Sequence, residues 1–367
     1  MSGPLLVIAA GGTGGHMVPA QALAEEMLRR GWRVQLATDA RGLRYADGFP
    51  QAVERVELSS ASLQRGGWGA RAAAPLALMN GALAAAGRFA RDRPACVAGF
   101  GGYPAFPALA GALWRRIPRL IHEQNGVLGR VNRLFAGRVD RVVCGTWPVT
   151  NAPTGANLVR MGNPVRAAAL EVRDRPYAPP GDGPLGLLVF GGSQGASVFA
   201  RLVPAAVAGL PPALRERLHV TQQVREGEED AVGAAYAEAG VEAALAPFFA
   251  DMPRRIADAQ LVIARAGAST VAELAAIGRP AILVPYPHAM DDHQTANARA
   301  LSDAGGAVVT PEHGLTAGGL AKLIERILAD PAEAAAMAEK ARAAGNPTAA
   351  SDLADLVEEL GAGVKSG

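Results

Sequence analysis

Glycine-rich loops placed directly after short apolar runs are the feature of this sequence that most restricts its fold. Three are present: residues 11–16 follow the apolar run 5–10, residues 99–103 follow 96–98, and residues 191–195 follow 185–190. Glycine permits positive φ and close backbone approach, and a helix that starts after such a loop presents free N–H groups. The arrangement therefore predicts sites suited to anionic groups such as phosphates.

The apolar runs along the chain predict parallel β-sheets. They are continuous rather than alternating, which is typical of strands covered on both faces. Alanine-rich helical segments lie between most of them, beginning with residues 19–30, and this alternation indicates βαβ units. We expect strands at residues 5–10, 34–38, 96–98, 120–122, 142–144, 185–190, 219–222, 261–264, 281–284 and 307–309.

The length of 367 residues predicts two domains, because a domain typically holds ~100–200 residues. Prolines and glycines crowd residues 145–184, where we expect the boundary. Each half begins with a strand, a glycine loop and a helix. We therefore predict an α/β protein of two doubly wound, Rossmann-like domains facing a cleft, with ligands at the carboxyl ends of the strands.

Composition narrows the class of protein further. The sequence has no run of ~18 apolar residues and no signal-peptide pattern at its start, so we expect a cytosolic protein. Cys96 and Cys144 lie in apolar runs and are expected to be buried thiols. Residues 1–163 carry 19 Lys and Arg against 9 Asp and Glu, whereas the remainder carries 17 against 25. The basic first half predicts an anionic partner, but not nucleic acid, because aromatic residues do not interleave with the basic ones.

The loops exclude some phosphate-binding motifs and leave others open. No loop has the G-x-x-x-x-G-K-[ST] pattern, and the first lysine is Lys322, so a P-loop is absent. A dinucleotide enzyme stays open because Asp39 ends the second strand. Residues 191–195 also match the G-x-S-x-G nucleophile elbow. A serine hydrolase using Ser193, with Asp251 or Asp258 and His288 or His293, is therefore the alternative enzyme, and a binding module without turnover is a further one.

Polar segments at predicted strand ends supply the remaining candidate residues. The run His122-Glu123-Gln124-Asn125 can contact a ligand or brace the domain, and bracing suits Glu123 at least as well. Ser269 and Thr270 open a predicted helix that contains Glu273. They can bind a diphosphate and a ribose, or the three can form a capping box. The segment 291–294 is interpreted as a solvated turn, and no required metal is expected.

Taken in order, these motifs resemble the MurG family of UDP-N-acetylglucosamine transferases over nearly the whole chain. The matching segments are Gly11-Gly12-Thr13-Gly14-Gly15-His16, Gly101-Gly102-Tyr103, residues 122–126, 162–166 and 191–196, Ala266-Gly267-Ala268-Ser269-Thr270 with Glu273, and residues 293–297. The resemblance implies the GT-B fold, with an acceptor- and membrane-facing domain at residues 1–163, a UDP-sugar domain at 164–346 and a helix at 347–367 that returns to the first domain. It implies an inverting transfer without metal or cofactor, from UDP-N-acetylglucosamine to undecaprenyl-diphospho-muramyl pentapeptide (lipid I), which gives lipid II.

The resemblance also implies roles for individual residues. The uridine contacts would be Arg166, the backbone near Phe249, and Glu273 on the ribose. The diphosphate contacts would be Ser193, Ala268, Ser269 and Thr270, and the sugar contacts Asn125, His293 and Gln294. Thr13, Gly14 and Gly15 would line the cleft and receive the acceptor diphosphate, with His16 as the catalytic base. An imidazole of ordinary pKa ~6.5 suits that task near neutral pH.

Members of this family dock on the cytoplasmic membrane face through an apolar patch with basic neighbours on the first domain. Here the matching residues 71–91 are rich in alanine, and the larger apolar side chains nearby are Trp68, Leu76, Leu78 and Met79. Trp114 stands beside Arg115 and Arg116. The basic first half favours anionic headgroups by ~1 kcal/mol for each basic residue near the surface. We expect peripheral binding in which the apolar part is weak.

Overall fold

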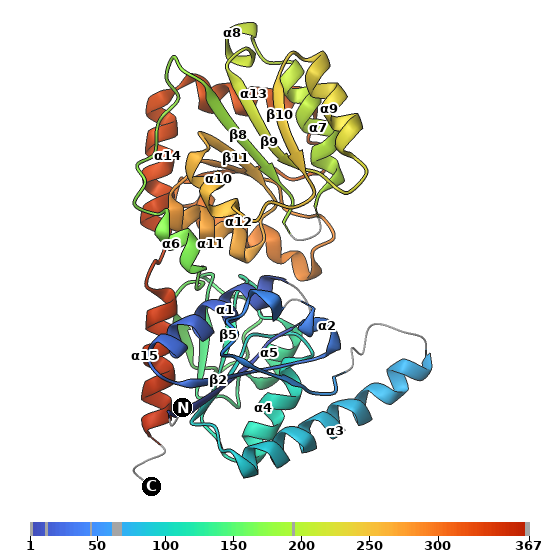
Figure 1. Ribbon diagram of the computed structural model, residues 1–367, viewed down its shortest axis with the longest axis vertical. Coiled ribbons are helices and arrows are strands. Elements are labelled where there is room, and N and C mark those ends of the chain that lie inside the picture. The colour runs from blue at the N-terminus through green and yellow to red at the C-terminus, as the bar shows by residue number, and fades with distance from the viewer. Residues whose placement is uncertain (1–2, 12–13, 45, 61–67, 193–194, 364–367) are drawn as a thin grey trace. The chain divides into compact units, whose positions relative to one another are not determined.

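The computed structural model describes residues 3–11, 14–44, 46–60, 68–192 and 195–363. For residues 68–73 it describes the backbone alone. The chain divides into two compact units (Figure 1). Unit 1 comprises Met1–Arg166 and Pro347–Gly367, and unit 2 comprises Ala167–Asn346. The functional roles assigned to the predicted domains stay predictions.

Unit 1 is built on a parallel sheet of seven strands in the order β3-β2-β1-β4-β5-β6-β7. Its strands are β1 (Leu5–Ala9), β2 (Arg33–Thr38), β3 (Glu54–Glu57), β4 (Cys96–Gly99), β5 (Arg119–Glu123), β6 (Arg141–Cys144) and β7 (Leu158–Arg160). Chain order reverses between β1 and β4, and that is the point where doubly wound sheets bind ligands.

Helices cover both faces of this sheet. On one face Leu6 and Ile8 of β1 pack with α1 (Gly14–Arg29) and α15 (Ala349–Ala362), whereas Leu5 and Val7 pack with the opposite layer. That layer consists of α3 (Trp68–Arg91), α4 (Ala105–Trp114) and α5 (Arg130–Phe135). The short helices α2 (Ala40–Leu43) and η1 (Ala46–Gly48) complete the described part of unit 1. The continuous apolar runs arise because residues on both sides of each strand are buried.

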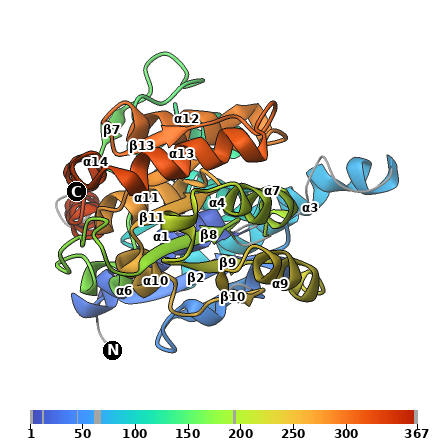
Figure 2. The ribbon, with the colours of Figure 1, turned by 90° about the horizontal axis from the view of Figure 1, so that it is seen from above.

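Unit 2 repeats the plan with six parallel strands in the order β10-β9-β8-β11-β12-β13. These are β8 (Leu185–Phe190), β9 (Leu218–Gln223), β10 (Glu242–Ala246), β11 (Leu261–Ala264), β12 (Ala281–Leu283) and β13 (Ala307–Val309). The helices are α6 (Ala167–Glu171), α7 (Ser197–Ala208), α8 (Pro212–Arg215), α9 (Glu229–Glu238), α10 (Met252–Asp258), α11 (Ala268–Ile277), η2 (Met290–Asp292), α12 (His293–Ser302), α13 (Ala317–Ala329) and α14 (Pro331–Ala344). Helices α7 and α13 lie side by side over one face (Figure 2).

The apolar runs in the sequence predict every interior strand but only one of the four edge strands, β13. The missed strands are β3, β7 and β10, all at sheet edges. Their burial patterns mix exposed and half-buried positions, as in Glu54–Glu57, where only Val56 is buried. An edge strand has one partner and less helix cover, so its sequence lacks the continuous apolar run that marks an interior strand.

Other expectations about local structure were corrected or confirmed. Helix α1 begins at Gly14 rather than at residue 19, because Pro19 is accommodated inside its early turns. Asp39 caps α2 by accepting a hydrogen bond from the Gly42 N–H at 2.8 Å, which removes the interpretation of Asp39 as a ribose-binding acid. Cys96 and Cys144 are buried free thiols as predicted, and burial raises the pKa of Cys144 to about 11.

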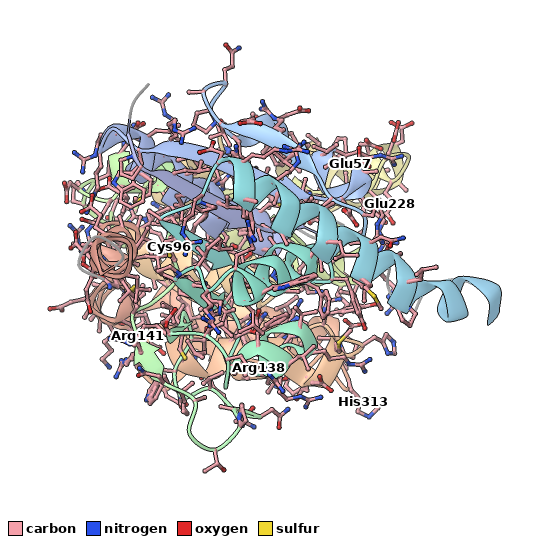
Figure 3. The ribbon with its side chains drawn as sticks, turned by 90° about the horizontal axis from the view of Figure 1, so that it is seen from below. Glu57, Cys96, Arg138, Arg141, Glu228 and His313 are labelled. Atoms are coloured by element: carbon pink, nitrogen blue, oxygen red, sulfur yellow. The ribbon has the colours of Figure 1, made fainter. Side chains whose placement is uncertain are left out.

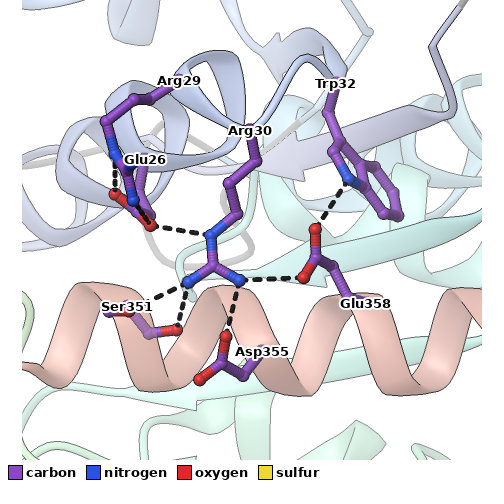
Figure 4. A network of polar contacts seen from close by, with 7 residues as sticks. All are labelled: Glu26, Arg29, Arg30, Trp32, Ser351, Asp355 and Glu358. Carbon is purple, nitrogen blue, oxygen red and sulfur yellow. Dashed lines mark hydrogen bonds and ion pairs between the residues drawn. The ribbon is translucent and has the colours of Figure 1, made fainter.

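The carboxyl-terminal helix α15 is attached to α1 by one arginine (Figure 4). Arg30 donates to Asp355 at 2.6 Å, to Glu358 at 2.9 Å and to the Ser351 hydroxyl at 2.9 Å, and also to Glu26 at 2.7 Å. Burial opposes the charge of Arg30, but these hydrogen bonds outweigh it and raise the pKa of the guanidinium. Beneath this network, Leu353, Ala354 and Val357 join the unit 1 core.

We expect Arg30→Met to lower the free energy of unfolding by about 1–3 kcal/mol, because several charge-assisted hydrogen bonds at a largely buried side chain are lost together. Thermal and denaturant unfolding measure the loss. Arg29→Met is the matched control, since within the described stretches Arg29 pairs with Glu26 alone and its side chain is 71% exposed. Equal melting temperatures for the two variants would contradict the role given to Arg30.

Candidate functional site

Two glycine loops of unit 1 flank the point where its strand order reverses. Gly11 ends the β1 strand region, and a Cβ there would lie 2.7 Å from Pro104 and 2.8 Å from the Thr38 hydroxyl. Gly14 and Gly15 open α1, as predicted for a loop that leads into a helix. Thr13, the predicted diphosphate contact, lies outside the described residues. The amino terminus of α1 thus faces the reversal point with backbone N–H groups.

The β4 loop forms a seat for the imidazole of His16. Gly101 and Gly102 have φ values of +94° and +74°. A Cβ on Gly101 would lie 3.1 Å from His16 Cε1, and one on Gly102 would lie 3.6 Å from His16 Cδ2. These glycines therefore serve the turn and also leave room for the ring. The glycines of this loop lie against the ring of the predicted base, and the expectation that the loop binds an anion stays a prediction.

Glu123, at the end of β5, is a brace rather than a ligand group. Its carboxylate is buried and accepts hydrogen bonds from the Gly129 N–H at 2.8 Å and the Asn132 amide at 2.9 Å. It also accepts from the backbone N–H and the side-chain amide of Asn125, each at 3.1 Å. Because the side chain of Asn125 is held by Glu123, this predicted sugar contact has a fixed position at the carboxyl edge of the sheet.

A second polar chain on the same strand end links His16 to the interior. His16 Nδ1 lies 2.9 Å from Gln124 Oε1, and Gln124 Nε2 lies 3.1 Å from His122 Nδ1. His122 Nε2 donates to the Gly162 carbonyl at 3.3 Å. His122 is fully buried, and burial lowers the pKa of its imidazole to about 4, so the ring is neutral. The sequence pattern includes Gln124 in a motif but predicts no role for it. Its partner His16 lies 108 positions away, so only the folded structure reveals the contact.

In unit 2 the start of α11 carries no side-chain cap. Its N-cap residue is Gly267, and neither Ser269 nor Thr270 caps the helix, so the capping-box interpretation is wrong. The first N–H groups of Ala268, Ser269 and Thr270 therefore lie at an uncapped helix start at the carboxyl end of β11. Glu273 lies one turn further along α11 and is 5% exposed.

The loop after β8 neighbours this helix start, because β8 and β11 are paired in the sheet. A Cβ on Gly191 would lie 2.4 Å from the Ala196 nitrogen, so the tight turn into α7 requires glycine. Ser193 lies outside the described residues. Phe249 follows β10 and is covered by the guanidinium of Arg255, whose carbon lies 4.2 Å from the ring centroid.

His293 and Gln294 begin α12 after β12, the next strand in the sheet. His293 Nδ1 lies 2.8 Å from the Met290 carbonyl and donates to it, and Gln294 Oε1 accepts from the Tyr286 N–H at 2.9 Å. Deeper in the helix, Asn297 donates to the Ala266 carbonyl at 3.2 Å. This bond ties α12 to the loop before α11 and was missed from the sequence.

Among the described residues, both candidate acids of the hydrolase alternative and His293 have other partners. Asp251 pairs with Arg255 at 2.7 Å, and Asp258 pairs with Arg175 at 3.0 Å. His293 is bonded to a carbonyl instead of an acid. Within the stretches that the structure describes, no three His, Cys, Asp or Glu side chains gather as metal ligands would. Arg166 ends the first segment of unit 1, and its predicted uridine contact stays a prediction.

Comparison with known proteins assigns both halves to one family. Residues 6–144 match the glycosyltransferase family 28 N-terminal domain, and residues 186–358 match the glycosyltransferase family 28 C-terminal domain.

Similarity to individual proteins extends over nearly the whole chain. A UDP-N-acetylglucosamine–N-acetylmuramyl-(pentapeptide) pyrophosphoryl-undecaprenol N-acetylglucosamine transferase of Rhodospirillum centenum is 52% identical, over 97% of this chain and 94% of that relative. The protein of the same name from Chelativorans sp. is 48% identical, over 99% of this chain and 97% of its own length. The crystal structure of MurG from Acinetobacter baumannii has a TM-score of 0.79 and 31% identity, covering 97% of this chain and 99% of that one.

The bracing role of Glu123 can be tested by Glu123→Gln. The amide would place its NH₂ group against donors that now face a carboxylate, so we expect the free energy of unfolding to fall by about 1–3 kcal/mol. Denaturant unfolding measures it. Glu57→Gln on the exposed edge strand β3 is the control and should leave the midpoint unchanged (Figure 3). A stable Glu123→Gln variant would assign the carboxylate a role other than bracing.

Proposed function

The chain belongs to the MurG family of glycosyltransferases, which has the GT-B fold, and on that premise we propose that it converts lipid I to lipid II in peptidoglycan synthesis. It transfers N-acetylglucosamine from UDP-N-acetylglucosamine to the 4-hydroxyl of the muramyl sugar on undecaprenyl-diphospho-muramyl pentapeptide. The observation that carries the proposal is similarity over nearly the whole chain to transferases of that name, which are 52% and 48% identical, together with the uncapped start of α11 at the reversal point of the unit 2 sheet.

On the acceptor side, His16 is the base we propose. It removes the proton of the 4-hydroxyl while that oxygen bonds to the anomeric carbon of the donor sugar. The bond between the anomeric carbon and the diphosphate oxygen breaks on the opposite face, so the configuration inverts. The ring of His16 is half-buried against Gly101 and Gly102, which supports a fixed position for the proton acceptor. Thr13, Gly14 and Gly15 would receive the acceptor diphosphate at the start of α1.

On the donor side, we assign the leaving diphosphate to the loop after β8 and the start of α11. Backbone N–H groups at Ala268, Ser269 and Thr270, together with Ser193, would stabilise the charge that develops on UDP without a metal ion. The uncapped start of α11 supports this, because its donors are not already bonded to a capping side chain.

The nucleoside and sugar are assigned to neighbouring groups. Glu273 would accept hydrogen bonds from the ribose hydroxyls, with Arg166 and the backbone near Phe249 on the uracil side. Asn125, His293 and Gln294 would contact the sugar. Asn125, His293 and Gln294 are each held by a neighbouring group, as expected of side chains that orient a ligand rather than move to meet it.

We further propose that unit 1 binds the cytoplasmic membrane face through α3 and the end of α4. Leu76, Met79 and Leu83 are 61%, 58% and 46% exposed and share one face of α3, while Leu78 is buried. Trp114 on α4 is 64% exposed. Leu83 thus takes the place of Leu78 in the apolar face expected from the sequence.

The two helices that carry this apolar face also carry basic groups. Helices α3 and α4 lie side by side (Figure 3), with Gly81 against Pro107 and Gly111 against Ala85, so they run in the same direction. Exposed arginines follow at their ends: Arg88, Arg91, Arg115 and Arg116. No helix in the described part of the chain is long and apolar enough to cross a bilayer. The apolar face and the exposed arginines together support peripheral binding to anionic lipid.

Purified protein supplied with UDP-N-acetylglucosamine and lipid I should release UDP and form lipid II, at the same rate with EDTA as without it. The reason is that protein N–H groups, rather than a cation, receive the charge on UDP. Coupled UDP detection and chromatography of the lipid product measure the two products. Loss of turnover in EDTA with recovery in magnesium would refute metal independence, and absence of lipid II would refute the function.

Membrane binding is tested by the double variant Leu76→Asp/Met79→Asp. Burying one such side chain in the membrane contributes ~1.5–3 kcal/mol to the binding free energy. The double variant should therefore bind vesicles containing phosphatidylglycerol at least about tenfold more weakly. Sedimentation with vesicles measures it, and added salt should weaken the wild type as well. Ala234→Asp/Ala237→Asp on exposed positions of α9 adds the same charge and should bind like the wild type.

A further inference from the structure

We infer that Gln124, oriented by His122, holds His16 in the tautomer with its proton on Nδ1, so that Nε2 is the unprotonated nitrogen that accepts the proton of the acceptor hydroxyl. Gln124 and His122 are therefore positioning residues for the transfer. The inference deepens the proposed function, because it rests on His16 being the base.

The assignment begins at the buried end of the chain of contacts. The Gly162 carbonyl can only accept a hydrogen bond, so the proton between it and His122 must sit on His122 Nε2. The low pKa of His122 leaves the ring one proton. His122 Nδ1 is therefore a bare acceptor, and its contact at 3.1 Å must come from a donor.

That requirement orients the amide of Gln124. The group facing His122 must be the NH₂, which also donates to the His122 carbonyl at 3.1 Å. The oxygen of the same amide then faces His16, and an amide oxygen is only an acceptor. At 2.9 Å, His16 Nδ1 must supply the proton. In the neutral imidazole, Nε2 consequently carries the lone pair.

Gln124 is well suited to impose this choice because its own position is fixed from both sides. The side chain is 1% exposed. Its backbone carbonyl accepts hydrogen bonds from the Thr146 hydroxyl and from the Asn163 amide, each at 2.9 Å. His122 in turn stacks on Phe100, with ring centroids 5.3 Å apart. Reversing the amide would place its oxygen against two acceptors, His122 Nδ1 and the His122 carbonyl, so one orientation is stable.

The test reads the tautomer directly in protein without substrate. With ¹⁵N-labelled histidine, and His16→Ala to assign the signals, the ring nitrogens of His16 are observed at a pH where the ring is neutral. We expect a protonated Nδ1 and a bare Nε2 in the wild type. Gln124→Met keeps the side-chain length but removes the acceptor, so the Nε2–H form should appear. A wild type with protonated Nε2, or an unchanged tautomer in Gln124→Met, overturns the inference.

Two further variants keep the test decisive if Gln124→Met folds poorly. In Gln124→Glu the carboxylate still accepts from His16, so the Nδ1–H tautomer should be retained while His122 Nδ1 becomes protonated. In His122→Phe the packing on Phe100 is kept but the amide loses one of its two acceptors, so the Nε2–H tautomer of His16 should gain population. Gln21→Met on α1 is the matched control and should leave His16 unchanged, because the side-chain partner of this glutamine among the described residues is Glu25.

Kinetics separate this inference from the proposed function. General base catalysis typically accelerates a reaction ~10²–10⁴-fold, so Gln124→Met should lower kcat by about 10²-fold and leave KM for the donor unchanged. Gln124→Glu should retain a higher kcat than Gln124→Met. A shifted tautomer with unaltered kcat would remove His16 as the base and leave its orientation by Gln124 standing. A wild type without transfer would refute the proposed function, while the tautomer would still be readable.

Discussion

Parallel strands that are buried on both faces leave almost no room for polar chemistry along their length, and this constraint organises both units. Only the strand ends are open, and in a parallel sheet the carboxyl ends share one edge. Most candidate functional groups of unit 1 follow β1, β4 and β5, and most of those of unit 2 follow β8, β11 and β12; the exceptions are Arg166 after β7 and Phe249 after β10. In each unit, two of these strands lie on either side of the point where chain order reverses.

The same constraint decides what could be predicted from the sequence. Interior strands such as 185–190 and 261–264 were found because helices on both faces demand continuous apolar runs. Edge strands such as β3 were missed because one neighbour and partial cover demand much less. The glycine loops could be predicted because only glycine fits where one stretch of backbone lies very close to another, as at Gly191. The spacing of Ser269, Thr270 and Glu273 fits both a capping box and a ligand site. The capping box is the wrong one of the two, because neither hydroxyl caps the helix.

Side-chain partners distant in sequence were beyond prediction from local pattern. Gln124 was visible as a polar residue after a strand, but its contact with His16 depends on how α1 and β5 meet in the folded sheet. Gly101 was assigned to anions, and its contact with the His16 ring is equally a product of tertiary structure. The motifs therefore located the site, while the arrangement of hydrogen bonds that selects a proton position is a property of the folded chain alone.

The return of α15 to unit 1 has a consequence for biosynthesis. Leu353, Ala354 and Val357 belong to the same core as Leu6 and Ile8 at the opposite end of the chain. While the ribosome is still synthesising unit 2, the apolar side of α1 that these residues cover is open to solvent. The helical layer over the amino-terminal sheet thus stays incomplete until α15 has been synthesised, so unit 1, whose translation begins first, is not the first unit that can finish folding.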